Sequence, residues 1–263
     1  MTAEIFDLEL RALRRDRAAR VGPELFLAER VFGDCLERLS FVRRSFRSAL
    51  LIGCPDPGWP GRLRQFIETV DVLDPGPLFA EAAGGTCVAE DRWSSMPGSY
   101  DLCIGIGTLD TVNALPLVLK NIRACLEDDG LLIGALAGGN GLPRLRAAMH
   151  SADLLAGAAS PHVHPRIEGP TLAALLSAAG FAMPVVDVDR VQVAYRGLDD
   201  LVRDLRRMAA TNILLQRSRK PLSRAAIAAA RGTFSDGQSK TIEIFEILHF
   251  AAWAPEPNAL QKG

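Results

Sequence analysis

Two predicted strands end in residue types that could hold a nucleoside. The apolar run 48–53 ends at Gly53. The run 68–73 is followed by Asp74, which lies 21 residues after Gly53. A carboxylate at the end of a second strand can accept two hydrogen bonds from ribose hydroxyls. An aspartate directly before Pro75 can also cap a helix over 75–83. The spacing therefore gives Asp74 two interpretations, a ribose contact and a helix cap.

The segment 100–137 carries the clearest structural pattern. Two continuous apolar runs, 101–106 and 131–136, flank residues that recur at three- and four-residue steps: Leu115, Val118, Leu119, Ile122 and Leu126. This periodicity predicts a strand, a helix and a second strand. Two apolar strands joined by a helix imply a parallel sheet covered on both faces. Ligands bind where such strands end, so we expect function first in the loop 105–112.

The composition predicts a globular chain without strong attraction to nucleic acid or membranes. The 263 residues carry a net charge of −1, and no apolar run approaches the roughly 20 residues of a membrane span. The N-terminus lacks an apolar signal core, and its acids argue against a transit peptide. Five cysteines without a CxxC motif predict buried thiols of a reducing compartment. We therefore expect a cytoplasmic protein with no nucleic-acid partner and no stable membrane insertion.

Helices are expected on either side of the sheet. Residues 1–46 should form an N-terminal helical cap with helices over 4–20 and 24–42, and the first contains Arg11, Arg14, Arg15, Arg17 and Arg20. The favoured interpretation of these arginines is a solvated face. The alternative is partner docking, because their charges make a local positive field.

The remaining residues are expected to form one α/β domain over 47–254. Within it, 197–231 should be a helical lid, with helices over 198–211 and 223–230, placed before a final antiparallel strand over 240–252. A lid excludes water and shapes a substrate pocket. The tail 255–263 is expected to be disordered.

The segment 100–137, which starts YDL and ends with DGLLIGALA, resembles the late half of the core of class I S-adenosylmethionine-dependent methyltransferases. The resemblance implies a Rossmann-like sheet of seven strands with the last strand antiparallel. It implies S-adenosylmethionine as cofactor, with a glycine turn at Gly53 and the ribose-binding acid at Asp74. The adenine-binding acid falls at Glu90 or Asp91. The complete set of implied cofactor residues is Gly53, Asp56, Asp74, Glu90, Asp91, Gly105 and Leu109.

The glycine turn departs from the family's pattern at two positions. Leu51 stands where an acid normally helps to hold the ammonium group of the cofactor, and Pro55 stands at the second glycine. Proline has no N–H to donate, so the turn is poorer in donors than the family's. Asp56 could supply a displaced carboxylate, although aspartate between prolines is also an ordinary turn residue. The departures imply a weakened cofactor site.

From Tyr100 to the C-terminus, the chain is similar to one branch of this superfamily, the alphaproteobacterial type of the complex I assembly factors and arginine hydroxylases. The matching residues include Val112-Asn113, Leu115-Pro116, Asp129-Gly130, Ser160-Pro161-His162, Ala179-Gly180-Phe181, Gln192-Val193, Tyr195, Asn212 and Trp253. The resemblance implies that Asp110 and Tyr195 lie near the acceptor. Asp110-Thr111 departs from the family, whose relatives carry a His-Trp pair there.

Three functions follow as hypotheses. The first is S-adenosylmethionine-dependent methyl transfer to an unknown acceptor, which could be a protein. The second is a non-catalytic role in complex I assembly, with a complex I subunit as partner, and the third is arginine hydroxylation. No metal site is expected, since His162 and His164 lie between prolines without a further ligand pattern.

Overall fold

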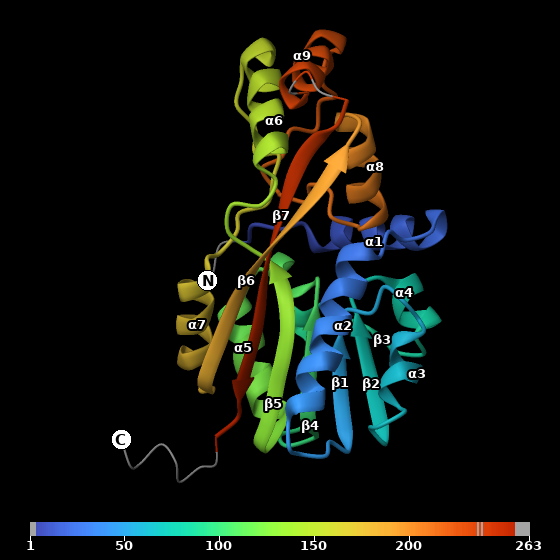
Figure 1. The fold of residues 1–263 in the computed structure, drawn as a ribbon, viewed down its shortest axis with the longest axis vertical. Coiled ribbons are helices and arrows are strands. Elements are labelled where there is room, and N and C mark those ends of the chain that lie inside the picture. Colours follow the sequence, from blue (N-terminus) through green and yellow to red (C-terminus); the bar gives the residue numbers. More distant parts are fainter. Residues whose placement is uncertain (1–3, 236, 238, 256–263) are drawn as a thin grey trace.

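The structure is a computed structural model that describes residues 4–235, 237 and 239–255. Seven strands form one sheet in the order β3-β2-β1-β4-β5-β7-β6 (Figure 1). β7 pairs antiparallel with both β5 and β6, whereas β1 to β5 pair in parallel. The expected Rossmann-like methyltransferase sheet with an antiparallel last strand is therefore confirmed.

The elements follow the sequence patterns closely. The strands are β1 Ser48–Ile52, β2 Thr69–Asp74, β3 Thr86–Cys87, β4 Tyr100–Ile106, β5 Leu126–Ala137, β6 Ala182–Tyr195 and β7 Thr241–Trp253. The α-helices are α1 Leu8–Val21, α2 Phe26–Phe41, α3 Trp59–Leu63, α4 Pro77–Ala82, α5 Leu115–Cys125, α6 Pro143–Ala156, α7 Gly169–Ala178, α8 Leu198–Arg207 and α9 Arg224–Phe234. Two short 3-10 turns, η1 Glu90–Arg92 and η2 Leu109–Thr111, follow β3 and β4.

Helices cover both faces of the sheet. α2 and α3 pack on one face through a core that includes Phe32, Trp59, Leu51 and Ile104. α5 and α7 pack on the other face through a second core, to which Leu119 contributes. The apolar runs of β1, β4 and β5 are explained by this burial on both sides.

A separate helical group stands on the projecting ends of β6 and β7 (Figure 1). α6, α8 and α9 share their own apolar core, which includes Leu145, Leu201, Ala226 and Phe234. α9 packs on α6, so of the two expected lid helices only α8 reaches the cavity described below. The expected lid is therefore smaller than the sequence suggested.

α1 lies across the carboxyl ends of the parallel strands, between α4 and α8 (Figure 1). Its buried residues are Arg11, Arg15, Asp16 and Ala18, while Leu13 is 64% exposed. The prediction of a solvated arginine face is therefore wrong for Arg11 and Arg15. These two side chains point into the protein because acids at the strand ends attract them.

Two predictions, the C-terminal tail and the domain boundaries, are not tested by the described residues. Residues 256–263 of the predicted tail lie outside the described residues, and the domain boundaries stay predictions. No helix in the described part of the chain is long and apolar enough to span a membrane.

Candidate functional site

The turn after β1 is fixed by close backbone contacts. Gly53 has φ +84°, and a Cβ there would lie 2.2 Å from the Ile106 carbonyl oxygen. The Gly53 N–H donates to the Leu73 carbonyl at 2.8 Å, which ties β1 to β2. Only glycine fits this conformation without strain. Leu51 is fully buried in the core, where a carboxylate would be desolvated.

Asp74 is fully buried and accepts hydrogen bonds from four donors. Arg15 approaches in a bidentate geometry, Nε to Oδ1 at 2.7 Å and Nη2 to Oδ2 at 2.5 Å. The N–H groups of Cys54 and Gly76 donate to Oδ2 and Oδ1 at 2.8 and 2.7 Å. A carboxylate offers about four lone-pair positions, so Asp74 has none left for a ribose. Asp74 is also not a helix cap, because the N-cap of α4 is Gly76.

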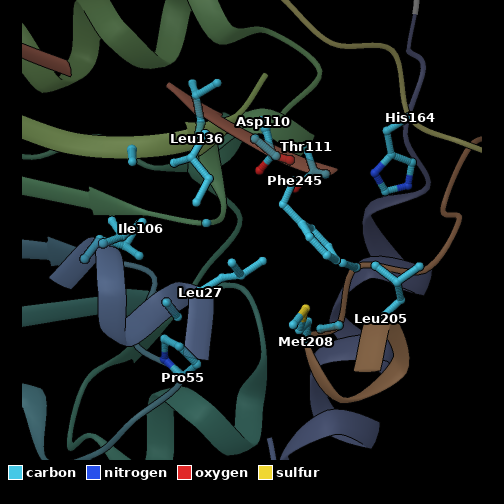
Figure 2. Close-up of a pocket in the computed structure, with 18 of the residues that line it drawn as sticks. Leu27, Pro55, Ile106, Asp110, Thr111, Leu136, His164, Leu205, Met208 and Phe245 are labelled. Carbon is cyan, nitrogen blue, oxygen red and sulfur yellow. The ribbon is translucent and has the colours of Figure 1, made fainter. Parts of the chain in front are cut away.

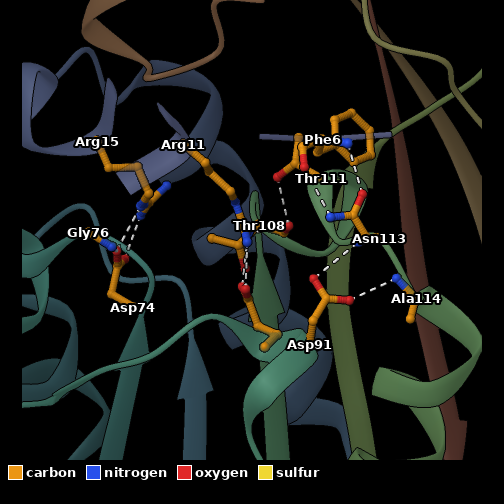
Figure 3. A network of polar contacts seen from close by, with 11 residues as sticks. Phe6, Arg11, Arg15, Asp74, Gly76, Asp91, Thr108, Thr111, Asn113 and Ala114 are labelled. Atoms are coloured by element: carbon orange, nitrogen blue, oxygen red, sulfur yellow. Dashed lines mark hydrogen bonds and ion pairs between the residues drawn. The ribbon is translucent and has the colours of Figure 1, made fainter. Parts of the chain in front are cut away.

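Glu90 is held in the same way by the other buried arginine. Arg11 donates from Nη1 to Oε2 at 2.7 Å and from Nη2 to Oε1 at 3.0 Å. Arg11 Nη2 also donates to the Thr108 carbonyl at 2.7 Å (Figure 3). Both acids that the resemblance assigned to the adenosine half of the cofactor are therefore paired with side chains of α1.

Burial of Arg15 alone would lower its pKa, but the charge and hydrogen bonds of Asp74 outweigh the burial, so the pKa is raised. Arg15 therefore stays charged. The neighbouring Cys54 behaves differently, since burial raises the pKa of its thiol to about 12. Cys54 is a protonated core residue and not a nucleophile at neutral pH.

Asp91 holds backbone at the start of α5. Its carboxylate accepts from the N–H groups of Asn113 at 3.1 Å and Ala114 at 2.7 Å. Asn113 Oδ1 accepts from the N–H groups of Ile5 and Phe6, both at 2.8 Å, and its Nδ2 donates to the Phe6 carbonyl (Figure 3). Asp91 and Asn113 therefore fix the chain just before α1.

The other cofactor residues that the sequence suggested have structural contacts. Asp56 Oδ1 accepts from the Gly58 N–H at 2.7 Å, as in an ordinary aspartate turn. Gly105 lies within β4, and Leu109 is buried in the core against it. Gly105 therefore belongs to the strand and not to the loop predicted over 105–112, whereas Leu109 lies in the 3-10 turn of that loop, and neither lines the cavity described next.

A cavity of about 180 Å³ opens beside these groups, at the carboxyl ends of β4 and β5 (Figure 2). Most of its lining is apolar and includes Leu27, Ile106, Leu136, Met208 and Phe245. Typical ligand pockets hold roughly 300–1,000 Å³. As α1 is docked, the cavity is small for a nucleoside-sized ligand.

Asp110 supplies one of the few charges in the cavity. Its Oδ2 lies 2.5 Å from Arg166 Nη1, which also donates to the Ala137 carbonyl at 3.3 Å. Tyr195, the other residue expected near the acceptor, is buried in the core of the helical group and does not line the cavity. Only Asp110 of this predicted pair lies at the site.

His164 lines the cavity as a neutral side chain. Its Nε2 accepts from the Ile213 N–H at 3.1 Å, and its ring meets the Phe6 ring edge-on. Burial and the nearby Arg166 lower the pKa of His164 to about 4. His162 instead lies 2.8 Å from Asp153 Oδ1. Within the described residues, no three His, Cys, Asp or Glu side chains are grouped to hold a metal.

His164 should make the protein less stable in acid. Its folded pKa lies below the unfolded value of 6.5. The unfolded chain therefore binds more protons as pH falls from 6.5 towards 4, and stability falls with it. We expect His164 to account for about 2 kcal/mol of the loss in unfolding free energy between pH 7 and pH 5. Urea titrations at both pH values should show a smaller loss for His164→Gln, whose amide oxygen can still accept from Ile213. An equal loss in both proteins would contradict this assignment.

Comparisons with known proteins agree with the fold. The arginine hydroxylase NDUFAF5 of Rattus norvegicus is 29% identical over 268 residues, 95% of this chain and 77% of the relative. A malonyl-[acyl-carrier protein] O-methyltransferase of Xylella fastidiosa is 34% identical over 160 residues, 60% of this chain and 52% of the relative. The N-methyltransferase NodS of Bradyrhizobium japonicum, solved with S-adenosylhomocysteine, superposes with a TM-score of 0.51 at 16% identity, over 95% of this chain and all of NodS. No protein-family model matches the chain.

The chain is similar in sequence to arginine hydroxylases and to an O-methyltransferase, and it shares the fold of class I methyltransferases. Its relatives include arginine hydroxylases and an O-methyltransferase, so two of the three hypotheses from the sequence, arginine hydroxylation and methyl transfer, have named relatives. The fold that it shares with NodS is one that holds S-adenosylhomocysteine in that protein.

Sequence reasoning missed the residues that fill this superfamily site. Arg11 and Arg15 were interpreted as solvated, and Arg166 and His164 were not assigned to the cavity. One signal was available, because Arg11, Arg15 and Ala18 share a helical face opposite Leu13. That pattern predicts a helix with charged residues inside.

Proposed function

We propose that this chain acts as a protein-binding assembly factor of the methyltransferase superfamily, in the assembly of respiratory complex I. The observation that carries the proposal is the pairing of Asp74 and Glu90 with Arg15 and Arg11. A role in binding protein does not need these acids to be free. The resemblance of the sequence to complex I assembly factors, together with the similarity to the arginine hydroxylase NDUFAF5 over 95% of the chain, supports the same role.

The residues of the superfamily's cofactor site do not fit S-adenosylmethionine in this arrangement. Arg15 and the N–H groups of Cys54 and Gly76 fill the acceptor positions of Asp74, and Arg11 occupies one position on each oxygen of Glu90. Leu51 supplies no carboxylate for an ammonium group, and Pro55 supplies no N–H for the methionine part. A ligand that needs these groups must displace α1 first.

We expect the purified protein to show no heat of binding with S-adenosylmethionine or S-adenosylhomocysteine up to millimolar concentration. The physical reason is that Asp74 has no acceptor position left for a ribose and that the guanidinium of Arg11 stands against Glu90. Isothermal titration calorimetry measures this directly, with the Asp74→Ala variant as a reference for non-specific heat. Micromolar binding to the wild-type protein would contradict the fit described above.

The assembly role itself is tested in the organism that encodes the chain. We expect deletion of the gene to reduce the amount of assembled complex I on a native gel, and the wild-type gene to restore it. A double variant, Asp110→Asn with Arg166→Met, removes the ion pair between these two residues and keeps the apolar lining of the cavity. Restoration of complex I by this variant would show that the assembly role does not need the ion pair between Asp110 and Arg166. Unchanged complex I in the deletion strain would overturn the assembly role.

The second candidate function is methyl transfer to an unknown acceptor, which could be a protein. The cavity lined by Arg11 and Arg15 favours it, because the carboxyl ends of parallel strands are where ligands bind in such sheets. This activity needs positioning more than acid–base groups, since a sulfonium already carries a good leaving group. Methyl transfer also requires that the ion pairs of Arg11 and Arg15 with Glu90 and Asp74 break.

A further inference from the structure

Charged side chains make the most deeply buried polar contacts of α1, while several of its apolar side chains are exposed. Arg11 and Arg15 are 4% and 7% exposed, whereas Leu13 and Val21 of the same helix are 64% and 57% exposed. Most helices of soluble proteins bury their apolar stripe. The docking of α1 therefore depends on the acids beneath it, and a competitor for those acids competes with the helix.

The spacing of the two arginines matches the spacing of the two acids. Arg11 and Arg15 lie one helical turn apart, so both guanidinium groups project from the same side of α1. Arg15 also lies over the Phe79 ring at 5.0 Å, and Asp16 accepts from the Leu78 N–H at 3.0 Å. α1 is thus fitted to the ends of β2 and η1 through several polar contacts at once.

The same acceptors cannot serve the helix and a nucleoside together. Ribose hydroxyls and an adenine amino group are hydrogen-bond donors, and so is every N–H of a guanidinium. The buried Thr108 hydroxyl beside Arg11 has no hydrogen-bond partner among the described residues. This orphaned polar atom indicates that the docked helix does not satisfy the site completely.

We propose that α1 is an autoinhibitory occupant of an adenosine-binding site. Arg15 and Arg11 block Asp74 and Glu90, and removal of the two arginines opens the site to adenosine nucleosides. This proposal goes beyond the assembly role and does not depend on it. A protein partner that held α1 elsewhere would open the site in the same way as the substitutions.

The test compares two double variants of the full-length chain. Arg11→Gln with Arg15→Gln removes the occupants, and Arg17→Gln with Arg20→Gln makes the same change in charge at exposed positions of the same helix. Calorimetry with S-adenosylhomocysteine should give at least a tenfold gain in affinity for the first variant and none for the second. Adenosine should bind the first variant within about tenfold of S-adenosylhomocysteine, because the turn at Pro55 offers little to the methionine part.

Each outcome decides the proposal. Equal affinity of both double variants and wild type would overturn it, and so would a folded first variant that binds neither probe at millimolar concentration. If the first variant does not fold alone, Arg15→Lys keeps a positive charge on Asp74 but loses the bidentate contact. A rise in its Tm with S-adenosylhomocysteine, absent in wild type, would support the proposal, and no rise would overturn it. Since complex I levels are not measured in these titrations, failure here leaves the assembly role standing.

Discussion

Replacing Arg15 with alanine is expected to lower the free energy of unfolding by about 3–5 kcal/mol, because Asp74 then stays buried without its counter-charge. Total stabilities of single domains are about 5–15 kcal/mol, so this variant would lose a large share of the whole. Urea denaturation followed by circular dichroism measures the difference.

Two further variants separate the cost of the lost charge from other effects. Arg17→Ala changes an exposed arginine of the same helix and should alter stability by less than about 0.5 kcal/mol. Arg15→Met combined with Asp74→Asn removes both charges and should recover part of the loss, since no unpaired ion remains. If the combined variant is no more stable than Arg15→Ala, the unpaired charge is not the cause.

The second large effect is expected at Gly53, where alanine should cost about 3–5 kcal/mol. The left-handed conformation at φ +84° contributes about 1–2 kcal/mol, and the new Cβ would collide with the Ile106 carbonyl oxygen. The clash comes from backbone on the neighbouring strand, which cannot move without breaking the pairing of β1 and β4. The same denaturation experiment measures the loss.

Gly107→Ala is the matched control for this substitution. Gly107 has a similar φ of +66°, but a Cβ there would have no neighbour within 4 Å. It should therefore cost only the conformational part, about 1–2 kcal/mol. Equal losses at Gly53 and Gly107 would show that the contact with Ile106 contributes nothing.

The sheet was predictable because its signals are local. The apolar runs of β4 and β5 and the periodic helix between them lie within 38 consecutive residues, and each pattern reports burial on its own. The antiparallel last strand came from the resemblance, since no local pattern distinguishes the direction of β7. Three helix limits differ from the prediction by four residues: α1 begins at Leu8 instead of residue 4, α8 stops at Arg207 instead of residue 211, and α9 continues to Phe234 instead of residue 230.

The site was predictable only in part, because its contacts are distant in sequence. Asp74 and Glu90 were found from their positions at strand ends, and both lie there. Their partners were missed because Arg15 is 59 residues from Asp74 and Arg11 is 79 residues from Glu90. An arginine on a helix is usually solvated, so the sequence favoured the wrong face. Pairing of buried acids is a property of the folded chain and has no local pattern.

The attachment of α1 also sets an order of events during synthesis. α1 precedes its partners in the chain, and the residues just before it contact Asn113 and the backbone of Ile213, which are synthesised much later. The helix can dock fully only after most of the chain has been translated. Contacts of such large separation slow folding, and β7, which joins β5 to β6, is also made near the end. α1 is thus made before its partners, yet it is among the last segments to reach its native contacts.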